Sequence, residues 1–236
     1  MPLVADSEAG FIIDSRPFKE KSLLLDLYTL NYGRISAVAR VSKSSASRSM
    51  GVYQPFIPLK LYLRQGRSSL WQLSDAIIQR QSFNIVPPKI FSAIYLNELL
   101  YYLTIPQDPE PHLFSAFLDA LERLEKDEDE FMILRNFEEI LIESLGYAPD
   151  YETINGESFK SDSFYIYLPK NGFIESSDVD NLLFSGKDLI CIKNRDFSER
   201  NTRIALKKLF KVIVDSLLNG RTLKSRALYS QFLMVK

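Results

Sequence analysis

The sequence predicts an α+β fold, in which a small N-terminal β-barrel precedes a mainly helical C-terminal domain with a short β excursion. Two observations carry this prediction. Short alternating segments separated by turn residues extend to about Gln79, and apolar residues recur at helical spacing after Pro87 and Pro88. Because 236 residues exceed the commonest single-domain size, we expect two domains, at residues 1–82 and 83–236.

The first part of the chain carries the barrel. Turn residues at 31–34 separate two apolar segments, which predicts a β-hairpin. Residues 59–64 alternate strictly between leucines and other residues, which predicts a strand with one core face. Its outward residues are Lys60, Tyr62 and Arg64. About five strands in this length suit an OB-fold, whose curved face commonly holds oligonucleotides, with an SH3-like barrel as the competing prediction.

Helical periodicity follows the two prolines. Gly146 supplies a stop signal, and residues 151–175 form the β excursion, with an Asn-Gly turn at Asn171. A strong helix is then expected from Ser198, as its N-cap, to Gly220 just past its C-terminus. The three earlier helices are expected at residues 90–103, 114–124 and about 131–145.

Several classes of protein are disfavoured. A single cysteine, Cys191, cannot form an internal disulfide or a multi-cysteine zinc site, so no metal is expected. No apolar run reaches about eighteen residues and no basic and apolar leader is present, so we expect a cytoplasmic protein without membrane contact. The single histidine, His112, has no recognisable nucleophile context, and glycine-rich phosphate motifs are absent. We therefore expect neither enzymatic activity nor a cofactor.

Charge is segregated along the chain although the formal net charge is only -1. Residues 1–82 hold 11 Lys/Arg against 6 Asp/Glu, residues 83–182 hold 6 against 20, and residues 183–236 hold 12 against 4. Two basic ends can attract a polyanion locally even when the whole molecule is nearly neutral. The alternative is chance segregation without spatial clustering.

In one half of the predicted barrel every charged residue is basic. From Leu27 to Ser74 there is no acidic residue, so this part is predicted to bind DNA phosphates. Tyr62 shares its strand face with two cations and is a candidate for stacking against unpaired bases. The competing interpretation is a solvated loop and an ordinary aromatic core. The candidates are Arg34, Arg40, Lys43, Arg48, Lys60, Tyr62, Arg64 and Arg67.

A second basic surface is predicted on the helix after Ser198. Steps of three, four and four residues bring its cations onto one stripe, because successive helical residues turn by about 100°. Only Asp215 offsets nine Lys/Arg between Arg200 and Lys236, whereas an ordinary solvated face usually mixes signs. The candidates for DNA binding here are Arg200, Arg203, Lys207, Lys211, Lys224 and Arg226.

Six short segments, taken in order, form a recognisable series: Ser15-Arg16-Pro17, Tyr32-Gly33-Arg34, Gln54-Pro55-Phe56, Tyr95 to Leu100, Phe137-Glu138 through Gly146-Tyr147, and Leu223-Lys224-Ser225-Arg226. Together these segments resemble the RecO family of bacterial DNA-repair mediators. They cover nearly the whole chain. A departure is that the stretch 151–172 lacks the four cysteines with which many members appear to bind zinc, so no zinc is predicted.

The resemblance implies an ATP-independent mediator with an N-terminal OB barrel and a helical domain. It would bind single- and double-stranded DNA, anneal complementary strands, and with RecR help RecA load onto strands coated by single-stranded DNA-binding protein (SSB). The acidic, apolar-tipped SSB tail needs a basic residue beside an apolar groove. Arg135 is the candidate, with an intrahelical ion pair to Glu138 or Glu139 as the alternative. The competing functions are an OB-fold protein-protein adaptor and an RNA-binding protein without annealing activity.

Overall fold

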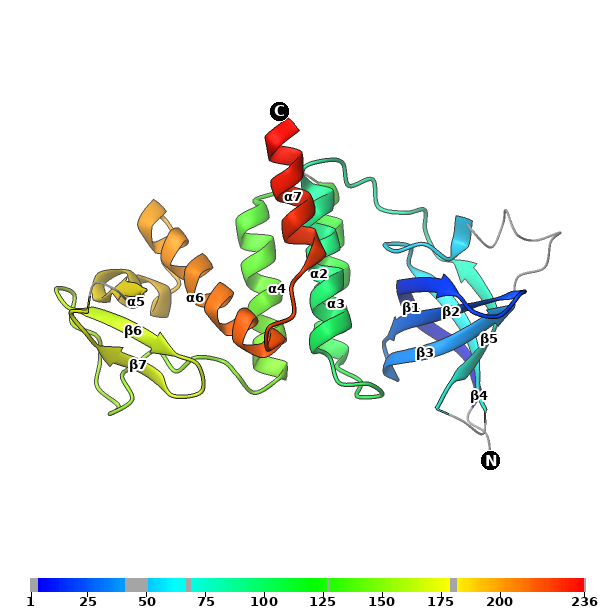
Figure 1. Ribbon diagram of the computed structural model, residues 1–236, viewed down its shortest axis with the longest axis horizontal. Coiled ribbons are helices and arrows are strands. Elements are labelled where there is room, and N and C mark those ends of the chain that lie inside the picture. Colours follow the sequence, from blue (N-terminus) through cyan, green and yellow to red (C-terminus); the bar gives the residue numbers. More distant parts are fainter. Residues whose placement is uncertain (1–3, 41–50, 67–68, 127, 179–181, 236) are drawn as a thin grey trace. The chain divides into compact units, whose positions relative to one another are not determined.

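The computed structural model describes residues 4–40, 51–66, 69–126, 128–178 and 182–235 (Figure 1). The chain forms two compact units. Unit 1 comprises residues 1–137 and 223–236, and unit 2 comprises residues 138–222. The expected domain division at residue 82 stays a prediction.

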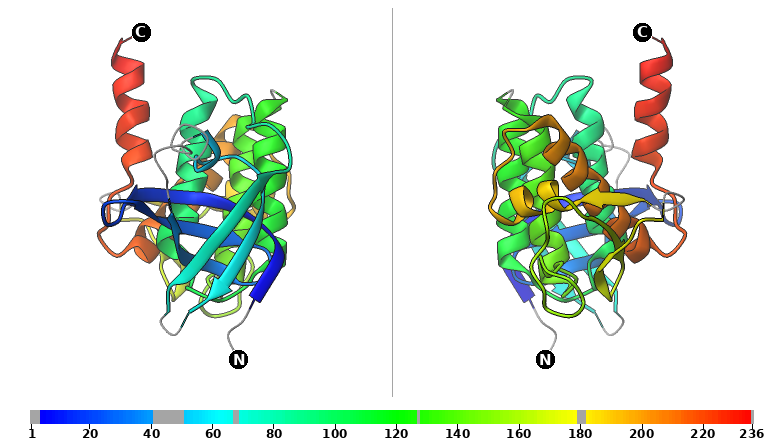
Figure 2. Two further views of the ribbon diagram at one scale, coloured as in Figure 1. Left: turned by 90° about the vertical axis from the view of Figure 1, so that its right-hand side faces the viewer. Right: turned by 90° about the vertical axis from the view of Figure 1, so that its left-hand side faces the viewer.

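Unit 1 opens with a closed barrel. The strands follow one another around it in the order β1-β2-β3-β5-β4, and every neighbouring pair is antiparallel except β3 and β5. Figure 2 (left) shows the blue strands crossing the cyan ones. This architecture confirms the predicted OB-type barrel and its first hairpin. The strands are β1 (Val4–Pro17), β2 (Ser22–Thr29), β3 (Gly33–Arg40), β4 (Leu59–Gln65) and β5 (Trp71–Ile78).

Alternating side chains fill the barrel. In β4 the three leucines are buried and Arg64 is exposed, as predicted. At the start of β5, Trp71 is only 1% exposed, and its ring centroid lies 4.9 Å from that of Tyr32. Each fully buried apolar side chain of this size contributes about 1.5–3 kcal/mol. A one-residue slip of a strand would lose this burial, so the inward pattern also fixes which residues face outward.

Four helices accompany the barrel: α2 (Lys89–Leu103), α3 (Pro111–Glu125), α4 (Glu130–Ser144) and α7 (Lys224–Val235). The first three confirm the predicted helices. In α2, Ala93 and Leu96 are buried whereas Ile90 and Ile94 are only half-buried. The reason is that α2 contacts β1, α3 and α7 together and is apolar on most of its circumference.

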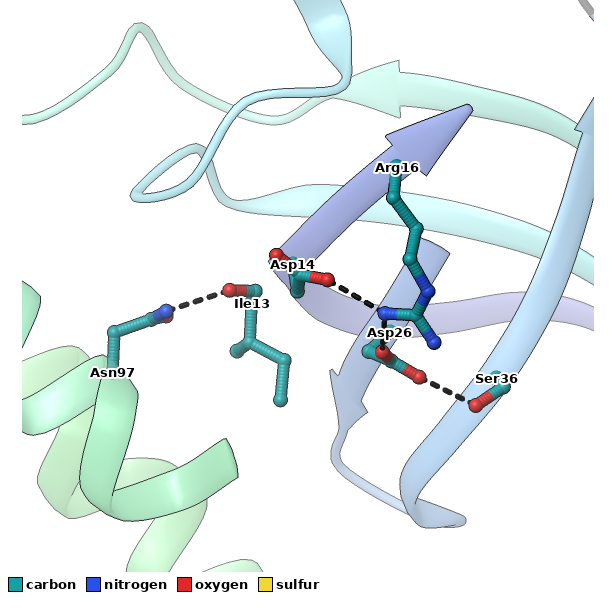
Figure 3. Close-up of polar contacts among 6 residues, drawn as sticks. All are labelled: Ile13, Asp14, Arg16, Asp26, Ser36 and Asn97. Atoms are coloured by element: carbon teal, nitrogen blue, oxygen red, sulfur yellow. Dashed lines mark hydrogen bonds and ion pairs between the residues drawn. The ribbon is translucent and has the colours of Figure 1, made fainter. Parts of the chain in front are cut away.

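Backbone and side-chain contacts join the barrel to the helices of unit 1. The Asn97 amide donates to the Ile13 carbonyl at 2.7 Å (Figure 3). The Phe11 ring centroid lies 5.7 Å from that of Phe114 and 5.2 Å from that of Phe117. The Gln107 backbone N–H donates to the Arg34 carbonyl at 2.9 Å. These contacts set the orientation of the barrel on α2 and α3.

A cluster of polar side chains joins β1, β2 and β3 on one surface of the barrel. The buried Asp26 carboxylate accepts from the Arg16 guanidinium at 2.7 Å and from the Ser36 hydroxyl at 2.5 Å (Figure 3). Asp14 accepts from the same guanidinium nitrogen. The hydrogen bond with Asp26 raises the pKa of Arg16 above its ordinary value. Through these bonds the Asp26 carboxylate ties β2 to β1 and to β3.

Unit 2 contains a small sheet and two helices. The predicted turn at Asn171 joins β6 to β7, and the strand order is β7-β6-β8 with antiparallel pairing throughout. On one face of the sheet Tyr165, Phe173 and Phe184 are fully buried. The elements are β6 (Phe164–Leu168), β7 (Gly172–Glu175), β8 (Leu183–Ser185), α5 (Gly186–Lys193) and α6 (Arg200–Leu218).

The start of α6 differs from the prediction. Its N-cap position is occupied by Glu199, whose side chain makes no capping hydrogen bond, so the prediction of Ser198 as N-cap was wrong. The Ser198 hydroxyl and backbone N–H instead donate to Asp196, at 2.7 and 3.1 Å. These bonds lower the pKa of Asp196 below its ordinary value.

Within the described parts of the chain, no helix has the length and apolar character that crossing a membrane requires.

Candidate nucleic-acid interface

A groove of about 1010 Å³ lies on the outer surface of the barrel. Strand pairing builds its floor: Gln72 of β5 pairs with Val38 of β3 on one side and with Arg64 of β4 on the other. Arg40 ends β3 beyond Val38, and Lys19 comes from the β1–β2 turn. The described residues that line the groove include Phe18, Lys19, Ser22, Val38, Arg40, Tyr53, Arg64, Trp71, Gln72 and Ser74.

The groove is positively charged and partly aromatic. Lys19, Arg40 and Arg64 line it, and no described lining residue is acidic. Burial, together with the charge of Asp75, raises the pKa of the Tyr53 hydroxyl, so this group stays a neutral hydrogen-bond donor at physiological pH. Cations that meet phosphates beside aromatic rings that can stack on bases are what a single-stranded nucleic acid requires.

Two residues of the groove were missed from the sequence. Phe18 and Lys19 lie in the turn between β1 and β2, and the Lys19 ammonium is 5.3 Å from the centroid of the Phe18 ring. The closed barrel brings this turn to the same groove as Arg64, which is distant in sequence. The available signal was an aromatic residue next to a cation at a turn, which by itself predicts no site.

Lys60 and Tyr62 lie on the outer face of β4, as predicted, but do not line the groove. The Lys60 ammonium is 5.6 Å from the centroid of the Tyr62 ring, and both side chains are half-buried. Asp75 pairs directly with Tyr62 across β4 and β5. The stretch without acidic residues ends at Ser74, and Asp75, the next residue, lies opposite Tyr62. Arg64 pairs with the neutral Gln72 instead, so its surroundings are more positive than those of Lys60 and Tyr62.

Arg34 has structural partners. Its guanidinium donates to the Thr104 hydroxyl at 3.2 Å and to the Thr104 carbonyl at 3.0 Å, and lies 5.8 Å from the Tyr101 ring centroid. These contacts tie β3 to the end of α2. Its role in DNA binding stays a prediction. Lys43, Arg48 and Arg67 lie outside the described residues.

The predicted stripe of α6 is present in unit 2. Arg200, Lys207 and Lys211 are exposed and Arg203 is half-buried, whereas Leu209 and other apolar residues fill the opposite face. Lys208 adds a further exposed cation that the prediction did not include. Asp215 pairs with Lys211 at 2.5 Å and offsets the end of the stripe. The structure thus presents a rigid row of cations spaced by about 6 Å along the helix axis.

The two remaining predicted DNA contacts begin α7. Lys224 is exposed, and its backbone N–H donates to the Glu98 carboxylate at 2.9 Å. The Arg226 guanidinium lies 5.9 Å from the centroid of the Tyr95 ring. Both belong to unit 1, whereas the stripe belongs to unit 2.

Arg135, the candidate for partner binding, is buried in α4. Its side chain is 7% exposed, and its guanidinium lies 5.8 Å from the Phe131 ring centroid. Glu139, one of the two alternative ion-pair partners, pairs instead with Arg195 at 2.8 Å. Arg135 therefore presents only a small part of its surface to a partner.

The fold and the groove together define a class of protein: OB-fold proteins that offer a basic, aromatic groove to a polyanion, here with a helical region attached. Two sequence families match the chain. The family described as Recombination protein O N terminal matches residues 4–81, and Recombination protein O C terminal matches residues 87–221.

Relatives agree over nearly the whole chain. DNA repair protein RecO of Tolumonas auensis is 36% identical, covering 97% of this chain and 96% of that protein. DNA repair protein RecO of Vibrio parahaemolyticus is 35% identical, covering 94% and 91%. The corresponding protein of Methylococcus capsulatus is also 35% identical, covering 93% and 91%. The chain belongs to the RecO family of DNA repair proteins, as its motifs predicted.

Proposed function

We propose that this chain is a DNA repair and recombination mediator that binds single- and double-stranded DNA and anneals complementary strands. With RecR it would help RecA load onto DNA coated by SSB. The observation that carries the proposal is the barrel groove, in which three cations and three aromatic residues meet without an acidic lining residue among those described. Membership of the RecO family supports the same role in DNA repair.

The groove would hold one strand reversibly. Arg40, Arg64 and Lys19 would neutralise phosphates and release their counterions, while Phe18 and Tyr53 would offer faces for stacking. Annealing needs charge neutralisation of two strands and bases that remain free to pair, and it includes no covalent step. We therefore assign no catalytic residue.

A second DNA segment would bind the α6 stripe. Its exposed cations contact phosphates without reading bases, which suits a duplex or a second strand of any sequence. Two separate basic surfaces on one chain would raise the local concentration of one strand near the other. Lys60, Tyr62, Lys224 and Arg226 are secondary candidates in this proposal.

The partner proposals rest on family membership and on one residue. The SSB tail would place its terminal carboxylate at Arg135 and its apolar side chains near Phe131. Arg135→Ala should then weaken binding of an SSB-tail peptide and leave DNA binding unchanged. Equal loss of both would contradict this separation. Binding of RecR is a separate part of the proposal, and it is tested by mixing this protein with purified RecR.

The annealing proposal is tested with complementary strands precoated with SSB, without nucleotide. Wild type should anneal them rapidly, and Arg40→Ala combined with Arg64→Ala should slow annealing by about tenfold or more. The same double variant should flatten the dependence of log affinity on log salt by about 2, because each phosphate contact contributes about one to that slope. The matched control is Lys126→Ala, which removes an exposed cation at the residue that follows α3.

The alternatives give different results. A folded wild type that fails to anneal over a range of salt, and whose partner binding is insensitive to salt, would be an adaptor. Preference for single-stranded RNA over DNA of the same sequence in competition would favour the RNA-binding alternative, because the 2′-hydroxyl lets a protein distinguish RNA from DNA at a site.

A further inference from the structure

The sheet of unit 2 has an apolar outer face. Side chains alternate along β6, so Phe164, Ile166 and Leu168 point away from the buried Tyr165. Ile166 pairs with Ile174 of β7 and with Leu183 of β8, which extends the apolar row across all three strands. Phe164 is 50% exposed and Leu168 is 38% exposed. We call these five residues the outer sheet face.

An antiparallel sheet with one packed face normally presents polar residues on the other. Here the packed face is already complete: the Phe159 ring lies 5.0 Å from Tyr165 and 5.1 Å from Phe173, centroid to centroid. The outer sheet face is therefore additional apolar surface. Phe164 and Leu168 are exposed, and Ile166, Ile174 and Leu183 are half-buried, so the row is open to solvent in part. An apolar row on a surface commonly marks a protein interface.

The segment that carries the outer sheet face is strongly acidic. Residues 143–178 contain seven Asp/Glu and two Lys, and one of these lysines, Lys160, is paired with Glu175 at 3.3 Å. An occupant should therefore present apolar side chains together with positive charge and without carboxylates. The acids are Glu143, Asp150, Glu152, Glu157, Asp162, Glu175 and Asp178.

One element of this same chain has those properties. Helix α7 packs against α2 through Phe232, whose ring centroid lies 5.1 Å from that of Phe91. Three further apolar residues remain exposed: Leu228 is 42%, Leu233 is 54% and Met234 is 85% exposed. No acidic residue occurs between residues 216 and 236, which hold four Lys/Arg. A helix that is apolar on most sides is ordinarily covered on more than one of them.

We propose that α7 of one copy of this chain docks on the outer sheet face of a second copy. The two surfaces are complementary in apolar character and in charge, and a helix covering the open face of a sheet is a common packing arrangement. Because the two surfaces differ, the contact is heterologous and leaves one of each exposed on a dimer. Lys224 and Arg226, which we propose contact DNA, begin α7, so DNA and the second copy compete for this end of the chain.

The test measures the mass of the full chain by sedimentation as its concentration rises from micromolar to submillimolar. Wild type should rise above the monomer mass of 27.2 kDa, less so at high salt. Leu168→Asp on the outer sheet face and Met234→Asp on α7 should each weaken self-association by about tenfold or more, since each places a carboxylate in an apolar contact. Val86→Asp, at another exposed apolar residue, is the matched control and should associate as wild type does.

A mixing experiment distinguishes this arrangement from a symmetric dimer. Leu168→Asp retains an intact α7 and Met234→Asp retains an intact outer sheet face, so an equimolar mixture should form a heterodimer although neither variant associates alone. Circular dichroism checks that both are folded, and Met234, being 85% exposed, can be changed without loss of core packing. A wild type that stays monomeric throughout, or variants that associate as wild type does, would overturn the proposal.

Discussion

Gly33 begins β3 at the point where the barrel meets the loop that follows α2. Its φ of 62° lies in the left-handed region, and a Cβ added there would be 2.2 Å from the Asp108 carbonyl oxygen. Both the backbone conformation and the close approach therefore require glycine. The Tyr-Gly-Arg segment was singled out from the sequence as a motif, but only the packing explains why it contains a glycine.

Gly33→Ala should destabilise unit 1 by about 3 kcal/mol or more, because positive-φ strain and a backbone clash act together. Denaturant unfolding measures this loss. Gly146→Ala is the matched control: its φ of 75° is also positive, but nothing lies within 4 Å of the added Cβ. It should cost only about 1 kcal/mol. Equal losses for the two variants would show that the contact with Asp108 contributes nothing.

The sequence correctly predicted which way a side chain points where the alternation along a strand determines that direction. Arg64 faces outward because Leu63 faces inward, and this could be read directly. Arg34 also belongs to an alternating strand, yet its long side chain reaches Thr104 of α2, a contact 70 residues away in the chain. No local pattern encodes such a partner, so the sequence could not separate a structural arginine from a DNA-binding one.

At the scale of elements, α7 begins on a carboxylate from another helix. Glu98 of α2 accepts from the backbone N–H groups of Lys224 and Ser225, both at 2.9 Å, and from the Ser225 hydroxyl at 2.6 Å. These are donors that the first turn of a helix otherwise leaves without partners. The motifs at residues 95–100 and 223–226, which appeared separate in the sequence, are thus two halves of one cap.

Glu98→Ala should loosen α7 selectively. Removing the cap costs about 1–2 kcal/mol locally, which corresponds to roughly tenfold faster amide exchange over the start of the helix. Hydrogen exchange followed by mass spectrometry of residues 224–235 measures this change, with α3 as the internal reference. Glu20→Ala, an exposed turn residue, serves as the control. Unchanged exchange in α7 would mean that packing against Phe91 alone holds the helix.

The connection between barrel and α2 is fastened to α3 by Glu125. Its carboxylate accepts from the Asn84 backbone N–H at 2.8 Å and from the Arg80 guanidinium at 2.7 Å. The Asn84 bond, followed by that of Arg80, lowers the pKa of Glu125 below its ordinary value of 4.5. A lowered pKa stabilises the folded state above the unfolded-state pKa, and this stabilisation is lost as pH falls through the folded-state value.

The stability difference between wild type and Glu125→Gln should therefore be full at about pH 7 and shrink below about pH 4.5. Urea unfolding at a series of pH values measures the difference. Arg80→Ala in both backgrounds should reduce it by removing one of the two donors. A difference that stays constant down to strongly acidic pH would contradict the assigned bonds.

The elements themselves were largely predictable. Five strands, the helices α2 to α4 and the hairpin β6–β7 all follow from periodicity and turn residues, because these are local properties. The start of α6 was wrong because Ser198 satisfies Asp196 instead of the helix. Which residues of α2 are buried could not be predicted, because three neighbours surround this helix and the number of neighbours is a tertiary property.

For the whole molecule, the net charge of -1 hides the groove. The chain should bind a heparin column at neutral pH although its sequence pI is about 6.0. Arg40→Glu with Arg64→Glu should lower the salt needed for elution markedly. The control variant, Lys126→Glu with Lys170→Glu, changes the net charge by the same amount outside the groove. It should lower the salt concentration needed for elution only slightly. Equal shifts would show that total charge, rather than its placement, controls binding.

The convergence of the groove could not be predicted. The sequence indicated basic residues in one half of the barrel, but the joining of Lys19 with Arg40 and Arg64 depends on barrel closure. Likewise, the opposition of Asp75 to Tyr62 depends on strand register. Composition locates charge along the chain, whereas topology decides which charges act together.

The parallel pairing of β3 with β5 closes the barrel, so each of its strands has a neighbour on both sides. Unpaired N–H and C=O groups along an open edge would invite a foreign strand to add itself by backbone hydrogen bonds. The barrel offers no such edge along its paired strands. A ligand that binds the barrel would therefore be held by side chains and loop groups and not by strand addition, so its arrival and departure would leave the sheet unchanged.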